Sequence, residues 1–516
     1  MITEAQAHQA LLEFLRSQDR PLWQHHLTLT RLVVRAFRLG RSALIQTATR
    51  PATYRLSYLA AALLWPDAVV LVTPEFHHES LLTVDIPRLL GAFGVTKAVQ
   101  TGEQMPPEFQ GLWVTTPETW LGDRLSACGG FPPQIPTLID PADDWAQLTR
   151  QHLTLTLTPQ DWDALWRSWL AHPDQPDPQQ IILNLYQSIT QAIRRRPSNP
   201  YHSHPLNPEE LDQLTTLHEQ LPPAPLPPPW EQFRQQWPQP GQLHWASRNA
   251  ATQQVNLHLA PIEVDQPLRG IWEQQPIVLM GGFLGLETNK GHRYRQQLGL
   301  GDWMQVKFSP QRQNDYIQLY IPDRMPLPNT RDFQPRLLDQ VLRLCRGGMI
   351  SQRRSHRHPP DWIAPLKRPV VVIVDDVPLR GQVAATVAAE FGSVVKVEQK
   401  GLAPEGILVC GWTFWRCHQE ALPLPQLLII ATLPLPSMEN PLVAGRVRHY
   451  KHQHQDWFHY YLLPVAMQEL QRAIVPVREV QGVVALLDNR VNHRSYGAKI
   501  LTALEPMARV NTIDFV

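Results

Sequence analysis

The sequence has few cysteines and few charged residues for its size. Its 516 residues include four cysteines, and charged residues make up 18% of the chain. Scarce, scattered cysteines argue against a disulfide framework and favour a reducing compartment. The formal net charge of +1 argues against a highly basic nucleic-acid coat and against an acidic tail protein, although a local basic groove is compatible with it.

The sequence also lacks a visible targeting signal and an unbroken membrane-spanning run. Residues 1–19 follow an amphipathic helical pattern without the basic and apolar regions of a signal peptide. The most apolar stretch, residues 56–72, is broken by Pro66 and Asp67, which favours a helix followed by a buried strand. The sequence therefore predicts a soluble, cytoplasmic protein with no membrane contact.

Apolar residues are plentiful, at 43% of the chain, and the length predicts about three domains at ~100–200 residues each. Short apolar runs alternate with helical patterns in two regions. The runs are residues 42–46, 68–72, 112–115 and 137–140, then 276–280, 370–374, 393–397, 406–410, 427–431 and 483–487. Apolar strands separated by helices indicate parallel sheets covered on both faces. We therefore predict an α/β protein with two doubly wound parallel-sheet lobes.

A different pattern lies between these regions. Three helix starts are indicated by a capping residue followed by proline, at Pro159, Pro178 and Pro208. The proline-rich residues 221–240 then indicate a stiff linker, partly polyproline II, with an SH3-type ligand as the alternative. The predicted division is 1–149 and 243–300 for the first lobe, 150–242 for a helical insertion with its linker, and 301–516 for the second lobe.

An ordered series of short motifs occupies the second half of the chain. It consists of IQLYIPDRMPLP at 317–328, GWTFW at 411–415, LPLPSMENPL at 433–442, PVA at 464–466 and GVVALLDNRV at 482–491. This series resembles that of the DinG/XPD-type superfamily 2 DNA helicases in their bacterial DinG-like form. The resemblance covers roughly residues 20–145 and 243–506, and it places the insertion where that family carries its arch domain. It implies two RecA-like lobes that hold ATP and Mg²⁺ and move along single-stranded DNA.

The phosphate loop of that family, GTGKT, falls on residues 51–55. Its lysine becomes Tyr54, and its magnesium-binding hydroxyl residue becomes Arg55. Pro51 and Thr53 replace the two glycines that let a backbone approach phosphates, and proline also lacks the N–H donor. No shift by one position restores the loop, because no lysine precedes Lys97.

The other catalytic motifs are altered as well. In the segment that matches the DEAH box, Asp140 keeps the magnesium-binding acid, but Pro141 replaces the catalytic glutamate. We interpret residues 140–144 as a solvated turn after a strand, and the alternative is that Asp143 or Asp144 acts as a displaced base. In the second lobe Pro476 replaces the first catalytic arginine. The second is replaced by Glu479, or kept as Arg478 if the register slips by one.

These matches give a set of candidate residues for nucleotide and metal. Asp140 is the candidate Mg²⁺ ligand, and no residue is assigned a catalytic role because Pro141 and Pro476 occupy the expected positions. The candidate nucleotide contacts, including a possible adenine-reading glutamine, are Gln24, Arg50, Thr53, Tyr54, Arg55, Asp140 and Arg478. Cys128 is the only cysteine between the two first-lobe motifs, so the family's four-cysteine iron–sulfur cluster cannot form there.

A basic stretch, RGGMISQRRSHR at residues 346–357, is the candidate DNA contact, through Arg346, Arg353, Arg354 and Arg357. The sequence as a whole predicts a DinG-like helicase homologue with weak or no ATPase, which binds single-stranded or branched DNA or a partner protein. Two alternatives stay open: an active ATP-dependent helicase with drifted motifs, and a purely structural scaffold.

Overall fold

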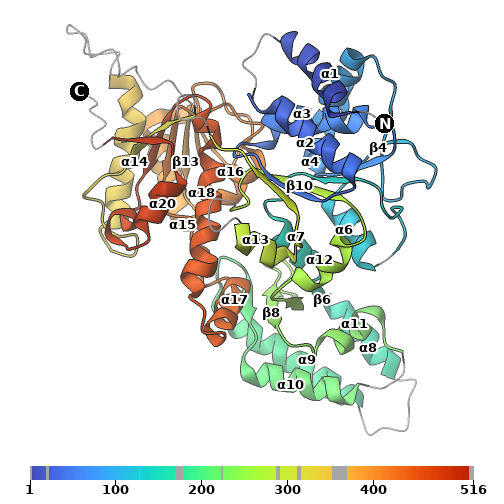
Figure 1. Ribbon diagram of the computed structural model, residues 1–516. Helices are drawn as coiled ribbons and strands as arrows, with labels where there is room; N and C mark the ends of the chain where they lie inside the picture. The colour runs from blue at the N-terminus through green and yellow to red at the C-terminus, as the bar shows by residue number, and fades with distance from the viewer. Residues whose placement is uncertain are drawn as a thin grey trace.

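The computed structural model describes residues 3–18, 23–126, 128–169, 178–221, 225–285, 291–310, 315–350 and 369–510. It contains two α/β lobes and a third unit below them, drawn mainly in green in Figure 1. No helix in the described ranges is long and apolar enough to cross a membrane.

The first lobe is a seven-stranded sheet in the order β11-β1-β10-β5-β2-β4-β3, with every pair parallel. Its strands are β1 (Ala43–Gln46), β2 (Val69–Val72), β3 (Ala98–Thr101), β4 (Gly111–Thr115), β5 (Thr137–Ile139), β10 (Ile277–Gly281) and β11 (Met304–Lys307). Ala43 and Ile45 enter one core cluster while Leu44 enters another, because successive side chains of a strand point to opposite faces. The predicted parallel sheet is confirmed.

Helices cover both faces of this sheet. One core contains residues of α1 (Glu4–Arg16), α2 (His26–Leu39), α3 (Pro51–Leu64), the π-helical turn η1 (Leu81–Asp85) and α5 (Ile86–Phe93), and α4 (Glu75–Ser80) precedes η1. The opposite core contains residues of α6 (Pro117–Ser126), α7 (Trp145–His152), α12 (Asp265–Trp272) and α13 (His292–Leu298). This layering is the doubly wound arrangement predicted from the apolar runs.

The second lobe is also a seven-stranded parallel sheet, in the order β14-β15-β13-β16-β17-β12-β18. Its strands are β12 (Ile317–Tyr320), β13 (Val370–Ile373), β14 (Val395–Val397), β15 (Ile407–Cys410), β16 (Leu427–Ile430), β17 (Val483–Leu486) and β18 (Met507–Val510). Its helices are α14 (Phe333–Ile350), α15 (Val377–Phe391), η3 (Gly392–Val394), α16 (Trp412–His418), α17 (Pro441–His452), η4 (Phe458–Leu462), α18 (Leu463–Arg478), α19 (Arg490–His493) and α20 (Gly497–Ala503). The RecA-like fold class is confirmed for both lobes.

The described part of the insertion contains the expected helices, together with an antiparallel sheet that the sequence analysis did not predict. Its strands β6 (Leu155–Leu157), β7 (Ser203–Pro205), β8 (Gln242–Arg248) and β9 (Val255–Pro261) pair in the order β6-β9-β8-β7. Its helices are α8 (Pro159–Trp169), α9 (Pro178–Arg195), α10 (Pro208–Gln220) and α11 (Pro228–Gln236). Three of them begin at the prolines that the sequence indicated, and Asn207 caps α10 through a capping box with Glu210.

The proline-rich segment is not a linker throughout. Within it, α11 packs Trp230 against Trp162 and Phe233, at ring separations of 4.8 and 5.2 Å. Trp230 is fully buried and donates its indole N–H to the carbonyl of Asp161. Burial of Trp230 and Phe233 on α11 favours a helix over polyproline II at residues 228–236. Residues 222–224 lie outside the described part.

Two expected boundaries differ from the structure. Strands β8 and β9 pair with β6 and β7, so the insertion continues beyond 242 to Pro261. Strand β11 pairs with β1, so the first lobe continues beyond 300 to Lys307. Both differences arise because the local sequence of a strand does not determine which sheet the strand joins.

Candidate nucleotide site between the lobes

The candidate site lies where β1 ends and α3 begins. Residues of the strand are buried on both faces, and Arg50 is the N-cap of the helix with Pro51 in its first turn. A strand, a loop and a helix N-terminus in this order direct backbone N–H groups toward an anion. The structure therefore keeps the architecture of a phosphate loop at the position that the sequence match indicated.

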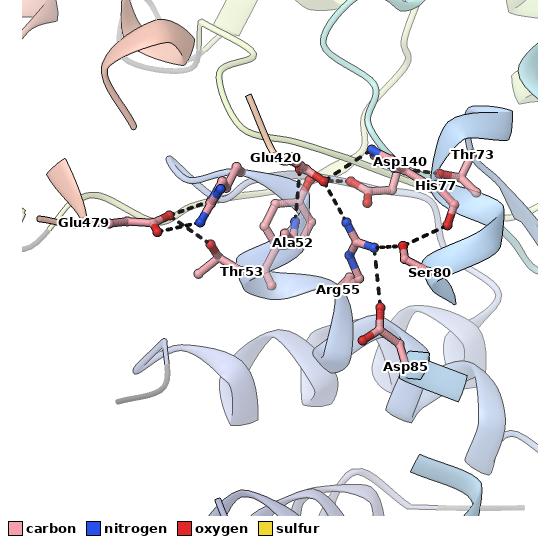
Figure 2. A network of polar contacts seen from close by, with 12 residues as sticks. Ala52, Thr53, Arg55, Thr73, His77, Ser80, Asp85, Asp140, Glu420 and Glu479 are labelled. Carbon is pink, nitrogen blue, oxygen red and sulfur yellow. Dashed lines mark hydrogen bonds and ion pairs between the residues drawn. The ribbon is translucent and has the colours of Figure 1, made fainter. Parts of the chain in front are cut away.

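Two carboxylates from the second lobe occupy the start of α3. Glu420, which follows α16, accepts the N–H of Ala52 at 3.3 Å and pairs with Arg55 at 2.9 Å. Glu479, at the end of α18, accepts two hydrogen bonds of 2.7 Å each from Arg50. Figure 2 shows Glu420 above Ala52 and Arg55, and Glu479 beside Thr53.

Arg55 is the hub of this network. Its side chain is 6% exposed, and besides Glu420 it contacts Ser80 at 2.9 Å and Asp85 at 3.4 Å. Burial raises the pKa of Asp85, and the charge of Arg55 opposes that rise. The guanidinium therefore contacts one acid from each lobe, Asp85 and Glu420. Arg55 occupies the position that the family resemblance assigns to the hydroxyl residue that binds magnesium.

Tyr54 and Asp140 form the buried centre of the site. The Tyr54 hydroxyl donates to the carboxylate of Asp140, which directly follows β5 and is completely buried. Burial raises the pKa of Asp140 to about 7, against the opposing effect of the Tyr54 and Tyr58 hydroxyls. The acid that corresponds to the magnesium ligand is thus bound by the residue that replaces the phosphate-loop lysine.

The acidic segment after Asp140 makes tertiary contacts that the predicted solvated turn did not include. Asp143 accepts backbone N–H groups of Gly282 at 3.0 Å and Phe283 at 2.7 Å. Asp144 pairs with Arg472 of α18 at 2.8 Å. Both carboxylates therefore make tertiary contacts, one within the first lobe and one across to the second.

Arg478 does not reach this site. It is 5% exposed and donates to the carbonyls of Asp315, Leu504, Glu505 and Pro506 at 2.6–3.1 Å. Burial lowers its pKa to about 10. Arg478 therefore braces the second lobe internally, and Pro476 lies buried within α18. The register without a slip, with Glu479 facing the loop, is the one that the geometry favours.

The remaining candidates lie at the margin or elsewhere. Gln24 is exposed and its amide contacts His25 at 3.0 Å, while the neighbouring Trp23 packs on Tyr54 at 6.2 Å. Arg346 pairs with Glu390 at 2.6 Å on the far side of the second lobe. Arg353, Arg354 and Arg357 lie outside the described residues.

No group of three or more metal-ligating side chains gathers in the part of the chain that the structure describes. Cys128 and Cys417 are exposed, and Cys345 and Cys410 are buried.

Sequence reasoning missed Glu420, Asp85 and Arg472. A signal was present: arginines flank and enter the degenerate loop at Arg50 and Arg55, while Glu479 stands where the related helicases carry an arginine. The sign of the charge is thus reversed on the second lobe, where it complements the arginines of the loop, and this complementarity suggests contact.

Comparisons with known proteins agree with this architecture. Residues 419–507 match the family model for a helicase C-terminal domain. The ATP-dependent DNA helicase YoaA of Escherichia coli strain K12 is 30% identical over 114 residues, which span 22% of this chain and 18% of that protein.

Solved XPD structures share the fold of nearly the whole chain. An apo XPD structure covers 94% of this chain and all of its own, with a TM-score of 0.57 and 14% identity. An XPD helicase and S. tokodaii Xpd4 each cover 95% of this chain with a TM-score of 0.59 and 13% identity.

Proposed function

We propose that the chain is a homologue of the DinG/XPD-type helicases that has lost ATP hydrolysis and binds single-stranded or branched DNA as a helicase-fold protein. The observation that carries this proposal is the pair of carboxylates at the start of α3. Glu420 and Glu479 take the place where the phosphates of a nucleotide would lie.

The site does not fit ATP and Mg²⁺, on which helicases of this lineage depend in general. Nucleotide phosphates would bring negative charge against Glu420 and Glu479, and Pro51 offers no N–H. Tyr54 supplies a neutral hydroxyl where a lysine is needed, and Arg55 cannot bind a cation. Asp140, buried and with a raised pKa, is held by Tyr54.

The ion pairs between the two lobes support a role other than nucleotide-driven movement. In ATP-driven translocation the nucleotide closes and opens two lobes in turn. Here three ion pairs, Arg50–Glu479, Arg55–Glu420 and Arg472–Asp144, already join the lobes. The lobes are therefore held in one arrangement without a nucleotide, which suits a protein that binds a strand and does not move along it.

The test is ATP hydrolysis by the purified protein, with and without single-stranded DNA, next to an Asp140→Ala variant. We expect no turnover above that of the variant. DNA-stimulated turnover that disappears with Asp140→Ala would overturn the proposed loss of hydrolysis, because it would mean that displaced residues had rebuilt the site.

DNA binding itself is measured by fluorescence anisotropy of a labelled oligonucleotide at several salt concentrations. We expect affinity that falls steeply with salt, because phosphate contacts release counterions. Weak, salt-insensitive binding would contradict the DNA part of the proposal and favour a structural scaffold or a protein-binding role.

A further inference from the structure

Three arginines gather at the junction of the lobes and the insertion, away from the start of α3. Arg150 lies on α7, Arg293 on α13 and Arg446 on α17. Figure 1 places α13 and α7 above α17, close to β8 of the insertion, and α7 contacts both α13 and β9. The three side chains share Tyr450 and Tyr461 as electrostatic neighbours.

The tyrosines fix one member of this arginine cluster. The Arg446 guanidinium stacks over the ring of Tyr461 at 3.9 Å and contacts the Tyr450 hydroxyl at 3.3 Å. Such stacking holds a guanidinium in place without neutralising its charge. Both rings are buried, with 2% of Tyr450 and 5% of Tyr461 exposed. Arg446 is thus pre-oriented with its positive charge intact.

The charge of the cluster is not balanced within the described residues. Among the described residues, Glu263 is the one acid that interacts electrostatically with these arginines. It accepts a hydrogen bond of 2.9 Å from the Tyr450 hydroxyl. Burial, together with the charge of Arg446, lowers the pKa of Arg150 and of Arg293 to about 10. Three cations therefore face one carboxylate in a region of reduced solvation.

Some hydrogen-bond donors of the arginine cluster also have no acceptor among the described residues. The buried Nε atoms of Arg293 and Arg446 have no hydrogen-bond partner among the described residues. Arg150 uses its Nε and one terminal nitrogen on the carbonyls of Pro261 and Ile262, at 3.1 and 2.8 Å, which ties it to the end of β9. Unpaired buried donors next to uncompensated charge are costly, and an anion with several acceptor oxygens removes both costs.

We infer that Arg150, Arg293 and Arg446 form a binding site for a phosphate group, filled by a backbone phosphate of a DNA strand that crosses the junction of the two lobes and the insertion. The inference rests on the proposed DNA binding and adds its location. Arg293 and Arg446 are half-buried, so a strand can reach them from solvent. Arg150 contributes mainly its positive charge, because two of its nitrogens already donate to backbone carbonyls.

The test compares Arg293→Gln with a matched control, Arg269→Gln. Both substitutions remove one positive charge, but Arg269 lies on the exposed surface of α12, with 59% of its side chain accessible. Arg293→Gln should preserve folding because Arg293 has no hydrogen bond to lose in the described residues, and the melting temperature checks this.

Anisotropy of a labelled single-stranded oligonucleotide is measured against salt for the three proteins. We expect Arg293→Gln to weaken binding and to lower the slope of log affinity against log salt by about 0.7–1. Arg269→Gln should leave that slope unchanged. Equal slopes for wild type and Arg293→Gln would overturn the location while leaving the proposed DNA binding intact.

Inorganic phosphate forms the second arm. If the wild-type protein binds no oligonucleotide, the proposed function and the strand as ligand both fail. A rise in melting temperature with phosphate, present in wild type and absent in Arg293→Gln, would then show a site for free phosphate instead of DNA. Absence of both effects would overturn the site altogether.

Discussion

Arg50 and Glu479 meet across the two lobes through two parallel hydrogen bonds of 2.7 Å, from Nε and Nη2 to the two carboxylate oxygens. Their side chains are 16% and 27% exposed. The pair reverses the polarity of an active helicase cleft, in which the second lobe presents an arginine toward a phosphate. The start of α3 has thereby become part of an interface between lobes.

Removal of Glu479 should loosen the lobes. For Glu479→Ala we expect a loss of about 1–3 kcal/mol in the free energy of unfolding. The reason is that the partly buried Arg50 loses both carboxylate oxygens to which it donates. The charge-swapped double variant Arg50→Glu/Glu479→Arg should regain part of that loss, as measured by urea denaturation.

Glu231→Gln serves as the control for this series, because Glu231 pairs with Arg234 on the surface of the insertion. Glu231→Gln should lower the free energy of unfolding less than Glu479→Ala does, because solvent screens an exposed ion pair. If Glu479→Ala is no more costly than this control, the pair does not hold the lobes together.

Repair of the phosphate loop alone should not restore nucleotide binding. In a variant with Pro51→Gly, Thr53→Gly, Tyr54→Lys and Arg55→Thr, the carboxylates of the second lobe would still face the start of α3. We expect binding of a fluorescent ATP analogue only after Glu420→Ala and Glu479→Ala are added. Equal binding with and without these two changes would show that the carboxylates do not exclude phosphates.

Asp140 should make stability fall as pH rises. Burial raises its pKa to about 7 in the folded protein, from an ordinary value of 3.8. Between these two values the folded state holds a proton that the unfolded state releases, so the free energy of unfolding decreases from about pH 4 to about pH 7 and is level above. The slope from one such group is at most about 1.4 kcal/mol per pH unit.

Comparison of wild type with Asp140→Asn isolates this effect. Buried histidines such as His26 and His77, whose pKa values burial lowers to about 4, titrate in both proteins and cancel. As pH rises from 5 to 8, the free energy of unfolding of wild type should fall relative to that of Asp140→Asn. A constant difference would mean that Asp140 is charged throughout.

Arg478 should be essential for the second lobe and irrelevant to nucleotide. Arg478→Ala leaves four carbonyls without their donor, and we expect a loss of about 3–5 kcal/mol in unfolding free energy. Arg494→Ala, at an exposed position beyond α19, should change stability by less than about 0.5 kcal/mol. Similar losses in the two variants would contradict the bracing role of Arg478.

The sequence by itself determined the types of element and the losses of chemistry. Apolar runs of four or five residues predicted β1, β2, β4, β5 and β10 of the first sheet and β13 to β17 of the second, but not β3, β11, β12 and β18. Capped prolines predicted the starts of α8, α9 and α10, because such preferences act over a few neighbouring residues. The identities of Tyr54, Pro141 and Pro476 in their motifs were also readable directly, since a missing functional group needs no coordinates to be noticed.

Only the tertiary structure decided which partners these residues have. Strand β11 joined the first sheet by pairing with β1, a strand distant in sequence, so the local sequence of β11 did not decide its place. In the same way, Glu479 and Glu420, the second-lobe partners of Arg50 and Arg55, lie more than 360 positions away from them. Local pattern cannot encode such a contact: the attraction of two charges depends on their distance and solvation, and the packing of the lobes fixes both.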